Sequence, residues 1–432
     1  MRRRILVAAL PVAAGLTLAT AVLFTPSADA PPRADAAPVA VVAGECGTDG
    51  CVTALQERLR THPRDGRSWS ALAVEYVEQA RVTGASSWYP KAQAAVDRAL
   101  ALGPDDDAAL AAAGVLAASR HDFAGALRFG DRAAAANPYS ARAQTVRTDA
   151  LVELGRYPEA LAAATAADDL KPGTPTFSRL SYLSELTGDT GRAAALLRRG
   201  VEPGAAPADI AFCRFHLGEL ARSAGDYSAA SAQYRAALTA DPAHLPARAG
   251  QARVLEARGD RAGAVRIYRS IVARLPLPQY ATELGELLEA SGDRAGASQQ
   301  YAVVRAAVAL SRSAGVADGP EVTLFEADHG RAASAMESGR AEWAKRKSIY
   351  VADALGWALY RAGRPVEALP YVRAATRLGT RDARLLFHRG MVEKAAGHPA
   401  GAREWLGRAL ALDPHFSPLD APVARTTLAG LR

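Results

Sequence analysis

The sequence predicts an all-α protein, a solenoid of about ten helical hairpins that ends in a capping helix. Two observations carry this prediction. The chain is rich in alanine and has only 6% aromatic residues, and alanine both favours helix and lets two helices approach closely. In addition, a turn followed five residues later by an alanine that is expected to be buried recurs at intervals of 33 to 38 residues. Such a period is typical of repeat architectures rather than of a single globular core.

Residues 1–36 differ from the rest of the chain and predict an N-terminal export signal. Three arginines at positions 2–4 precede an uncharged, largely apolar run over residues 5–24, and small residues follow in the pattern of a signal peptidase site. We expect cleavage after Ala36 and hence a secreted or cell-envelope protein. The alternative is an uncleaved anchor in the cytoplasmic membrane, because residues 5–24 are long enough to span a bilayer.

Residues 37–54 predict a flexible linker that contains a cysteine pair. Cys46 and Cys51 are separated by two glycines, a threonine and an aspartate, a loop flexible enough to close a small disulfide in an oxidising compartment. Two thiols without a nearby histidine are a poor metal site, since zinc usually takes four ligands, or three and a water. The sequence therefore predicts no metal here and leaves open whether the cysteines are bridged.

The stretch AGDYSAASAQYRAALTADP, residues 224–242, shows how one hairpin is built. Gly225 follows a helical run and predicts a left-handed residue that ends the helix, and Asp226 is placed to cap the first amides of the next helix. An Asp-Pro pair then ends the second helix, because proline disfavours helix in the residue before it. The apolar face of this second helix recurs at spacings of four and three, at Ala230, Tyr234 and Ala237.

The same unit recurs through most of the chain. The alanine five residues after each turn lies at Ala126, Ala160, Ala193, Ala230, Ala264, Ala297, Ala335, Ala368 and Ala402. One further unit precedes these, so we expect ten hairpins over residues 55–416. The first unit and those around Ala193 and Ala335 depart most from the pattern. Residues 417–432 predict a lone capping helix, which a solenoid needs to cover the apolar face of its last unit.

This period of about 34 residues, with Leu-Gly pairs at Leu217-Gly218, Leu284-Gly285 and Leu355-Gly356, resembles the tetratricopeptide repeat family. The resemblance covers residues 55–416. It implies a right-handed superhelix whose first helices line a concave groove, and such grooves in relatives hold peptides or partner helices. The expected partner is accordingly a protein or a peptide.

No motif in the sequence points to an enzyme. The chain contains no Gly-x-Ser-x-Gly, no His-Glu-x-x-His and no glycine-rich phosphate loop, and no strand pattern that would build a dinucleotide fold. We therefore predict a non-catalytic protein without a cofactor. The net charge of +7 is mild for 432 residues, so nucleic acid is not an expected partner. Membrane contact is expected only through the N-terminal segment, if that segment is not cleaved.

Aromatic residues on the predicted first helices suggest where a partner binds. In residues 349–363 the repeat signature occupies one face and leaves a second stripe, in which aromatic rings predominate, to line the groove. Tyr and Trp are enriched among binding hot spots because they bury much area at little entropic cost. The alternative is that the rings fill gaps between neighbouring hairpins. The proposed partner-binding residues are Phe212, Phe215, Tyr350, Trp357, Tyr360 and Phe387.

Two classes of function remain open from the sequence. The favoured one is an exported, non-catalytic interaction scaffold. The other is a ligand-responsive sensor or an enzyme with a site in the irregular regions, residues 82–88, 201–207 and 315–325. A pocket with converging titratable groups at these loops would favour the second class, and a smooth open groove the first.

Overall fold

The computed structural model describes residues 48–431, in which all regular secondary structure is α-helical. Consecutive helices pack in antiparallel pairs and successive pairs contact each other, with α15 and α16 meeting through the rings of Tyr301 and Phe325, so the predicted all-α solenoid of hairpins is confirmed. The predicted leader and Cys46 lie outside the described residues, so a bridge to Cys51 stays a prediction. No helix in the described part is both long and apolar enough to cross a membrane.

Ten hairpins lie between a leading helix, α1 (Thr48–Thr61), and a closing helix, α22 (Asp420–Ala429). The paired helices are α2 (Gly66–Thr83) and α3 (Trp88–Leu102), α4 (Asp107–Ser119) and α5 (Phe123–Ala136), α6 (Ala141–Glu153) and α7 (Tyr157–Leu170), α8 (Thr174–Leu186) and α9 (Thr190–Arg199), α10 (Pro207–Ser223) and α11 (Tyr227–Ala240), α12 (Leu245–Ala257) and α13 (Arg261–Arg274), α14 (Pro278–Ala290) and α15 (Arg294–Ser313), α16 (Pro320–His329) and α17 (Ala332–Lys345), α18 (Ile349–Arg361) and α19 (Pro365–Ala375), and α20 (Ala383–Ala395) and α21 (Pro399–Leu412).

The start of α1 corrects part of the linker expected over residues 37–54. Residues 48–54 are helical because α1 presents an apolar face to α2, formed by Val52, Leu55 and Leu59, which are at most 7% exposed. Apolar residues three and four positions apart lie on one side of a helix. The leading helix therefore packs on the first hairpin and covers one end of the solenoid, as α22 does at the other.

In five of the ten hairpins an aspartate caps the second helix as predicted. Gly225 adopts φ 75°, a left-handed conformation that glycine takes without steric cost, and Asp226 accepts a hydrogen bond from the Ala229 amide at 2.9 Å. The same aspartate cap occurs at Asp122, Asp189, Asp260 and Asp293. Local sequence therefore determines these turns. In one hairpin His121, with φ 62°, replaces the glycine.

Glycine on the first helix makes room for a ring from the second helix. The Tyr234 side chain is fully buried, and a Cβ added at Gly218 or Gly250 would overlap its ring. Gly285 has the same relation to Tyr301. At these positions an aromatic ring therefore occupies the space that glycine leaves.

Ala230→Trp should destabilise the protein. Ala230 is completely buried, so a larger side chain would force neighbouring helices apart at a cost of roughly 1 to 3 kcal/mol or more. Ala232→Trp on the exposed face of the same helix is the matched control. Thermal melting followed by circular dichroism should show a lower midpoint for the first variant only. Equal melting of the two would mean that Ala230 is not a packing position.

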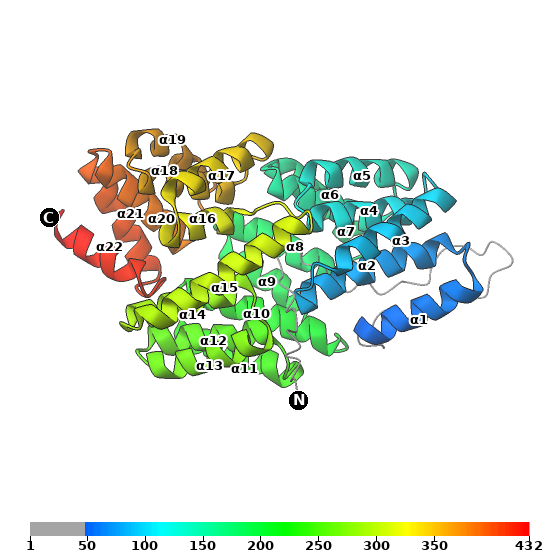
Figure 1. The fold of residues 1–432 in the computed structure, drawn as a ribbon, viewed down its shortest axis with the longest axis horizontal. Helices are drawn as coiled ribbons and strands as arrows, with labels where there is room; N and C mark the ends of the chain where they lie inside the picture. The colour runs from blue at the N-terminus through cyan, green and yellow to red at the C-terminus, as the bar shows by residue number, and fades with distance from the viewer. Residues whose placement is uncertain (1–47, 432) are drawn as a thin grey trace, which may run out of the picture.

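The chain turns through the solenoid until its C-terminal half contacts its N-terminal half. In Figure 1 the yellow helix α17 ends beside the cyan hairpins, and the orange helices α19 and α20 lie farther from them. Loops that precede α16 and α18 meet the turns that follow α4 and α6. The amide of Ala317 donates to the carbonyl of Arg120, and that of Lys347 to the carbonyl of Leu154, both at 3.3 Å.

The next two turns repeat this contact. The turn after α8 faces the loop before α20, so that a Cβ at Gly188 would lie 2.5 Å from the carbonyl oxygen of Gly379. The turn after α10 faces the loop before α22, where the Tyr227 hydroxyl hydrogen-bonds to Asp413 Oδ1 at 2.5 Å. Four successive turns thus contact four successive loops, and the first helices of the N-terminal hairpins face the C-terminal half across the interior.

Candidate functional site

Two of the six aromatic residues predicted to bind a partner lie in the core. Trp357 on α18 is 3% exposed and Phe387 on α20 is 1% exposed. The Trp357 ring stacks on His388 with centroids 4.1 Å apart, and its Nε1 donates to Asp328 at 2.8 Å. The neighbouring first helices α16 and α20 cover this position from both sides. In this conformation the two rings fill space between hairpins, which corrects their expected exposure in the groove.

Two further residues of the set, Phe215 and Tyr360, are half-buried. Tyr360 stacks on Trp357 with ring centroids 4.8 Å apart. Phe215 lies between His216 and His244, at centroid distances of 5.0 and 5.6 Å. Both side chains retain some accessible surface, and their role in binding a partner stays a prediction.

The remaining two residues, Phe212 and Tyr350, are at an interior pocket. Phe212 lines the pocket from α10. Tyr350, at the start of α18, packs against the same buried cluster as Tyr182 of α8, which also lines the pocket. The structure therefore brings together two members of the predicted set that are more than a hundred residues apart in sequence.

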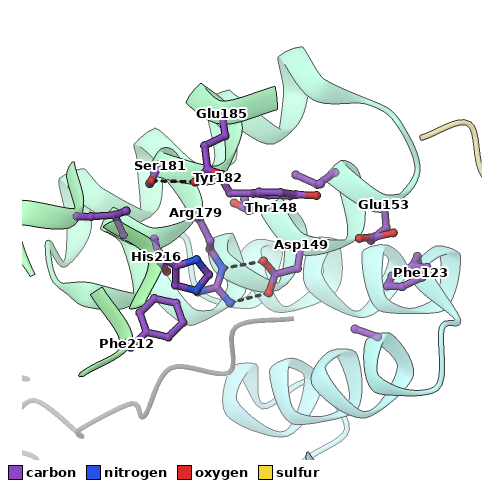
Figure 2. A pocket seen from close by; sticks show the side chains of 14 residues that line it. Phe123, Thr148, Asp149, Glu153, Arg179, Ser181, Tyr182, Glu185, Phe212 and His216 are labelled. Atoms are coloured by element: carbon purple, nitrogen blue, oxygen red, sulfur yellow. Dashed lines mark hydrogen bonds and ion pairs between the residues drawn. The ribbon is translucent and has the colours of Figure 1, made fainter. Parts of the chain in front are cut away.

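This pocket is formed mainly by the first helices α6, α8 and α10, on the face they turn toward the interior (Figure 2). It encloses about 660 Å³ of space between protein atoms, including space open to solvent. Many of its polar and aromatic side chains are only partly buried, so solvent reaches them. The lining residues are Ala118, Phe123, Thr148, Asp149, Val152, Glu153, Ser178, Arg179, Ser181, Tyr182, Glu185, Leu197, Phe212 and His216.

An arginine and an aspartate form a fixed pair in the pocket wall. Arg179 Nε and Nη2 donate to Asp149 Oδ1 and Oδ2 at 2.7 and 2.6 Å, and Figure 2 shows the two side chains meeting beside His216. Such a two-pronged contact is strong and directional. The Arg179 side chain is 6% exposed, and its charge is matched by Asp149.

A second arginine, Arg346, matches another carboxylate of the pocket from the opposite half of the chain. Its guanidinium donates to Glu153 Oε2 at 2.5 Å and to Glu342 Oε2 at 2.9 Å, and it lies over the Phe123 ring with 4.8 Å to the centroid. Arg346 is only 2% exposed. This contact ties the end of α6 to the segment between α17 and α18, so Glu153 has a structural partner.

Glu185 is the carboxyl of the pocket that has no ion pair among the described residues. Its contact is a weak hydrogen bond from Ser181 Oγ at 3.4 Å. Burial raises the pKa of Glu185 to about 8, and the Glu219 carboxylate adds to the effect. Burial also lowers the pKa of His216 to about 4, so that imidazole is neutral at pH 7.

The acidic residue of the corresponding stripe on α10 is neutralised by the chain itself. Glu219 accepts from Arg253 at 2.9 Å, and Arg253 also donates to Glu283 at 3.0 Å. Although burial opposes its ionisation, Glu219 has a pKa lowered to about 2, because Arg222 and Arg253 stabilise the carboxylate. The contrast with Glu185 is therefore one of neighbouring cations and not of burial.

Three residues of the pocket were not predicted from the sequence, although the repeat register contains a signal for them: Tyr182, Glu185 and Asp149. Glu219 and Arg222 stand six and three positions before the turn glycine Gly225. Counting back six and three from Gly188 gives Tyr182 and Glu185, and six back from Gly155 gives Asp149. The repeat register thus places them on the interior stripe. The prediction missed them because it was guided by aromatic rings in other units.

Glu185→Gln should stabilise the protein at alkaline pH and not at acid pH. The unfolded carboxyl titrates near 4.5 and the folded one near 8, so between these values the folded state binds the extra proton and stability falls as pH rises. Glutamine removes this loss, which is on the order of a few kcal/mol. Melting should show Glu185→Gln above wild type at pH 9 and equal to it at pH 4. Exposed Glu404 gives the control, Glu404→Gln, which should show no such pH-dependent gain.

In the part of the chain that it describes, the structure shows neither a pocket of titratable groups at the irregular loops nor a smooth open groove, the two features that would have separated the function classes. A pocket with converging titratable groups exists, but it lies on the interior stripe and not at residues 82–88, 201–207 or 315–325. The loop after α15 serves to contact the turn after α4. Among the described residues, no group of three or more His, Cys, Asp or Glu side chains is arranged to hold a metal ion.

Family profiles support the repeat assignment in two parts of the chain. Two tetratricopeptide repeat profiles match, one over residues 221–287 and one over residues 354–415. The first extends from the end of α10 into α14, and the second from α18 to the end of the last hairpin. These segments are tetratricopeptide repeats, as the sequence period predicts. No curated protein matches the sequence.

Solved structures with similar folds include several tetratricopeptide repeat proteins. The Cut9–Hcn1 hetero-tetramer of the APC/C is 13% identical, with 89% of this chain and 90% of that chain covered and a TM-score of 0.39. A thermophilic repeat protein of Thermus thermophilus is 25% identical, with coverages of 43% and 99% and a TM-score of 0.38. YrrB, described as having an unusual peptide-binding site, is 20% identical, with coverages of 42% and 92% and a TM-score of 0.30. Scores below 0.5 carry no conclusion about what this chain binds.

Proposed function

We propose that this protein is an exported, non-catalytic scaffold that binds a peptide segment of a partner protein on the interior face of its repeats. The observation that carries the proposal is the pocket built from equivalent stripe positions of α6, α8 and α10. Tetratricopeptide repeat proteins generally act as interaction scaffolds, and the stripe that binds partners in such repeats is the one that forms this pocket.

The side chains of the pocket suit recognition better than catalysis. Asp149 and Glu153 are held by arginines, which fixes their position and keeps them from acting as bases. Phe212 and Tyr182 offer ring surface next to these polar groups. Apolar surface with a few fixed polar groups is typical of sites that bind a ligand without transforming it.

A crosslinking experiment tests the binding site. A photoreactive phenylalanine analogue at position 212 would be activated in the native host, with the same analogue at exposed Tyr139 as the control. We expect position 212 to crosslink one protein reproducibly and position 139 not to do so. Identical crosslinks from both positions, or none from position 212, would contradict binding in the pocket.

Cell fractionation tests the export part of the proposal separately. The motivating observation is the arginine-led apolar run over residues 5–24, followed by the small-residue pattern that ends at Ala36. We expect the mature chain outside the cytoplasm with Ala37 as its first residue by N-terminal sequencing. Recovery of the intact chain from the cytoplasmic membrane would favour the anchor instead, and recovery from the cytosol would contradict export.

A further inference from the structure

One carboxyl of the pocket has no cationic partner among the described residues. Its lining contains three carboxyl side chains, Asp149, Glu153 and Glu185, and one guanidinium, that of Arg179. Arg179 is engaged by Asp149, and Arg346, which approaches from the C-terminal half, is engaged by Glu153. After both pairs are formed, Glu185 remains without a cation. Its pKa of about 8 keeps it mostly protonated at pH 7 in the unbound protein, and a cation bound beside it would favour the ionised form.

Glu185 differs in this respect from Glu219, the acidic residue of the same stripe on the next first helix, α10, which is held by Arg222 and Arg253. Glu256 on α12 stands three positions before its turn glycine, as Glu185 does, and Arg261 favours its ionised form. The chain thus supplies two cations to Glu219 and none to Glu185.

The walls of the pocket suit an organic cation. Tyr182, Phe212 and Phe123 contribute aromatic rings, and His216, whose ring centroid is 4.3 Å from that of Phe212, adds a flat neutral surface. The faces of such rings attract ammonium and guanidinium groups, more so where water is partly excluded. The long methylene stem of a lysine or arginine can pack along the same rings while its charged end reaches a carboxyl.

From this arrangement we infer that the pocket receives a basic side chain, lysine or arginine, from the bound peptide, and that Glu185 is its counter-ion. The inference rests on the proposed function, because it assumes that a peptide occupies the interior face. It goes beyond that function by naming the kind of peptide side chain that one subsite accepts. Asp149 and Arg179 form the wall of this subsite, and Glu185 makes the ion pair that no residue of the described chain provides.

Selection from a random-peptide library on the full-length protein tests the inference. We expect the selected peptides to share a lysine or arginine at one position. A synthetic copy of the best peptide should bind wild type at least roughly tenfold more tightly than Glu185→Gln, as measured by calorimetry. Glu256→Gln, at the equivalent position of α12, is the matched control and should bind like wild type.

A second peptide keeps the test valid even if the Glu185 variant folds poorly. Replacing the shared basic residue by norleucine retains the hydrocarbon stem and removes the charge, and wild type should then bind at least roughly tenfold less tightly. The norleucine peptide should bind wild type and Glu185→Gln equally, because the two changes remove the same ion pair.

The possible failures are distinguishable. Selected peptides that bind tightly without a shared basic residue, or whose affinity is unaffected by both Glu185→Gln and norleucine, would overturn the inference and leave the proposed function intact. Equal losses in Glu185→Gln and Glu256→Gln would also overturn it, since the effect would not be specific to the pocket. Failure to select any peptide would overturn the proposed function, and the inference with it.

Discussion

Gly155→Ala should destabilise the protein far more than alanine at an equivalent turn glycine elsewhere. Gly155 ends the turn after α6 with φ 78°, where any side chain costs roughly 1 to 2 kcal/mol. In addition, a Cβ there would overlap the carbonyl oxygen of Lys347 in the C-terminal half. This neighbour is backbone, so relief requires the two halves to move apart. We expect a total loss of several kcal/mol in the free energy of unfolding.

Gly259→Ala is the matched control for this prediction. Gly259 ends the turn after α12 with φ 90°, and nothing lies within 4 Å of an added Cβ. The control therefore contains the conformational cost alone. Urea unfolding of both variants measures the difference, and limited proteolysis should show earlier cleavage near Lys347 only in Gly155→Ala. Equal destabilisation by the two substitutions would mean that the halves do not contact each other at this turn in solution.

The sequence predicts the hairpins well because their determinants are local. Gly225 and Asp226 specify a turn through their own backbone and side-chain preferences, and Ala230 marks the buried face through its place in the period. Each of these signals is complete within one unit. The same logic explains why the short α16 could be anticipated from Gly319-Pro320 before it.

The contact between the two halves could not be predicted in the same way. The hydrogen bond from Tyr227 to Asp413 joins residues 186 positions apart, and the pair of Arg346 and Glu153 spans 193. Their formation depends on how small rotations between successive hairpins accumulate over several units. No local pattern reports that sum, so nothing in the residues of one unit indicates that Tyr350 on α18 lies near Tyr182 on α8.

The prediction that the rings of the aromatic stripe are exposed is wrong for Trp357 and Phe387 for a related reason. The period identifies which face of α18 carries Trp357, but it does not tell how closely the neighbouring first helices approach that face. Trp357 is covered by His388 and Tyr360, while Tyr350 on the same stripe reaches Tyr182 across the interior. A ring at a groove position is therefore a packing residue in one place and part of the pocket in another.

Arg346→Met should be the most damaging of the charge-removing substitutions. Arg346 is 2% exposed and neutralises Glu153 and Glu342. Its positive charge also favours the ionised form of the buried Glu321 carboxyl. Methionine would leave Glu153 and Glu321 in the interior without this cation and Glu342 with Lys345 alone, and removing one partner of a buried pair costs about 3 to 5 kcal/mol. The surface pair of Arg340 and Glu367 provides the control, because an exposed pair contributes at most about 1 kcal/mol and Arg340→Met should change little.

The pH dependence of Arg346→Met distinguishes loss of charge from loss of packing. If uncompensated carboxylates cause the destabilisation, protonating them should restore part of the stability, so the deficit relative to wild type should shrink as pH is lowered from 8 to 5. A combined Arg346→Met, Glu153→Gln, Glu342→Gln variant should unfold at higher urea concentration than Arg346→Met at pH 8, because the acids have been removed along with their cation. If the deficit were the same at both pH values and in the combined variant, the guanidinium would act through its contact with Phe123 and not as the charge that joins the two halves.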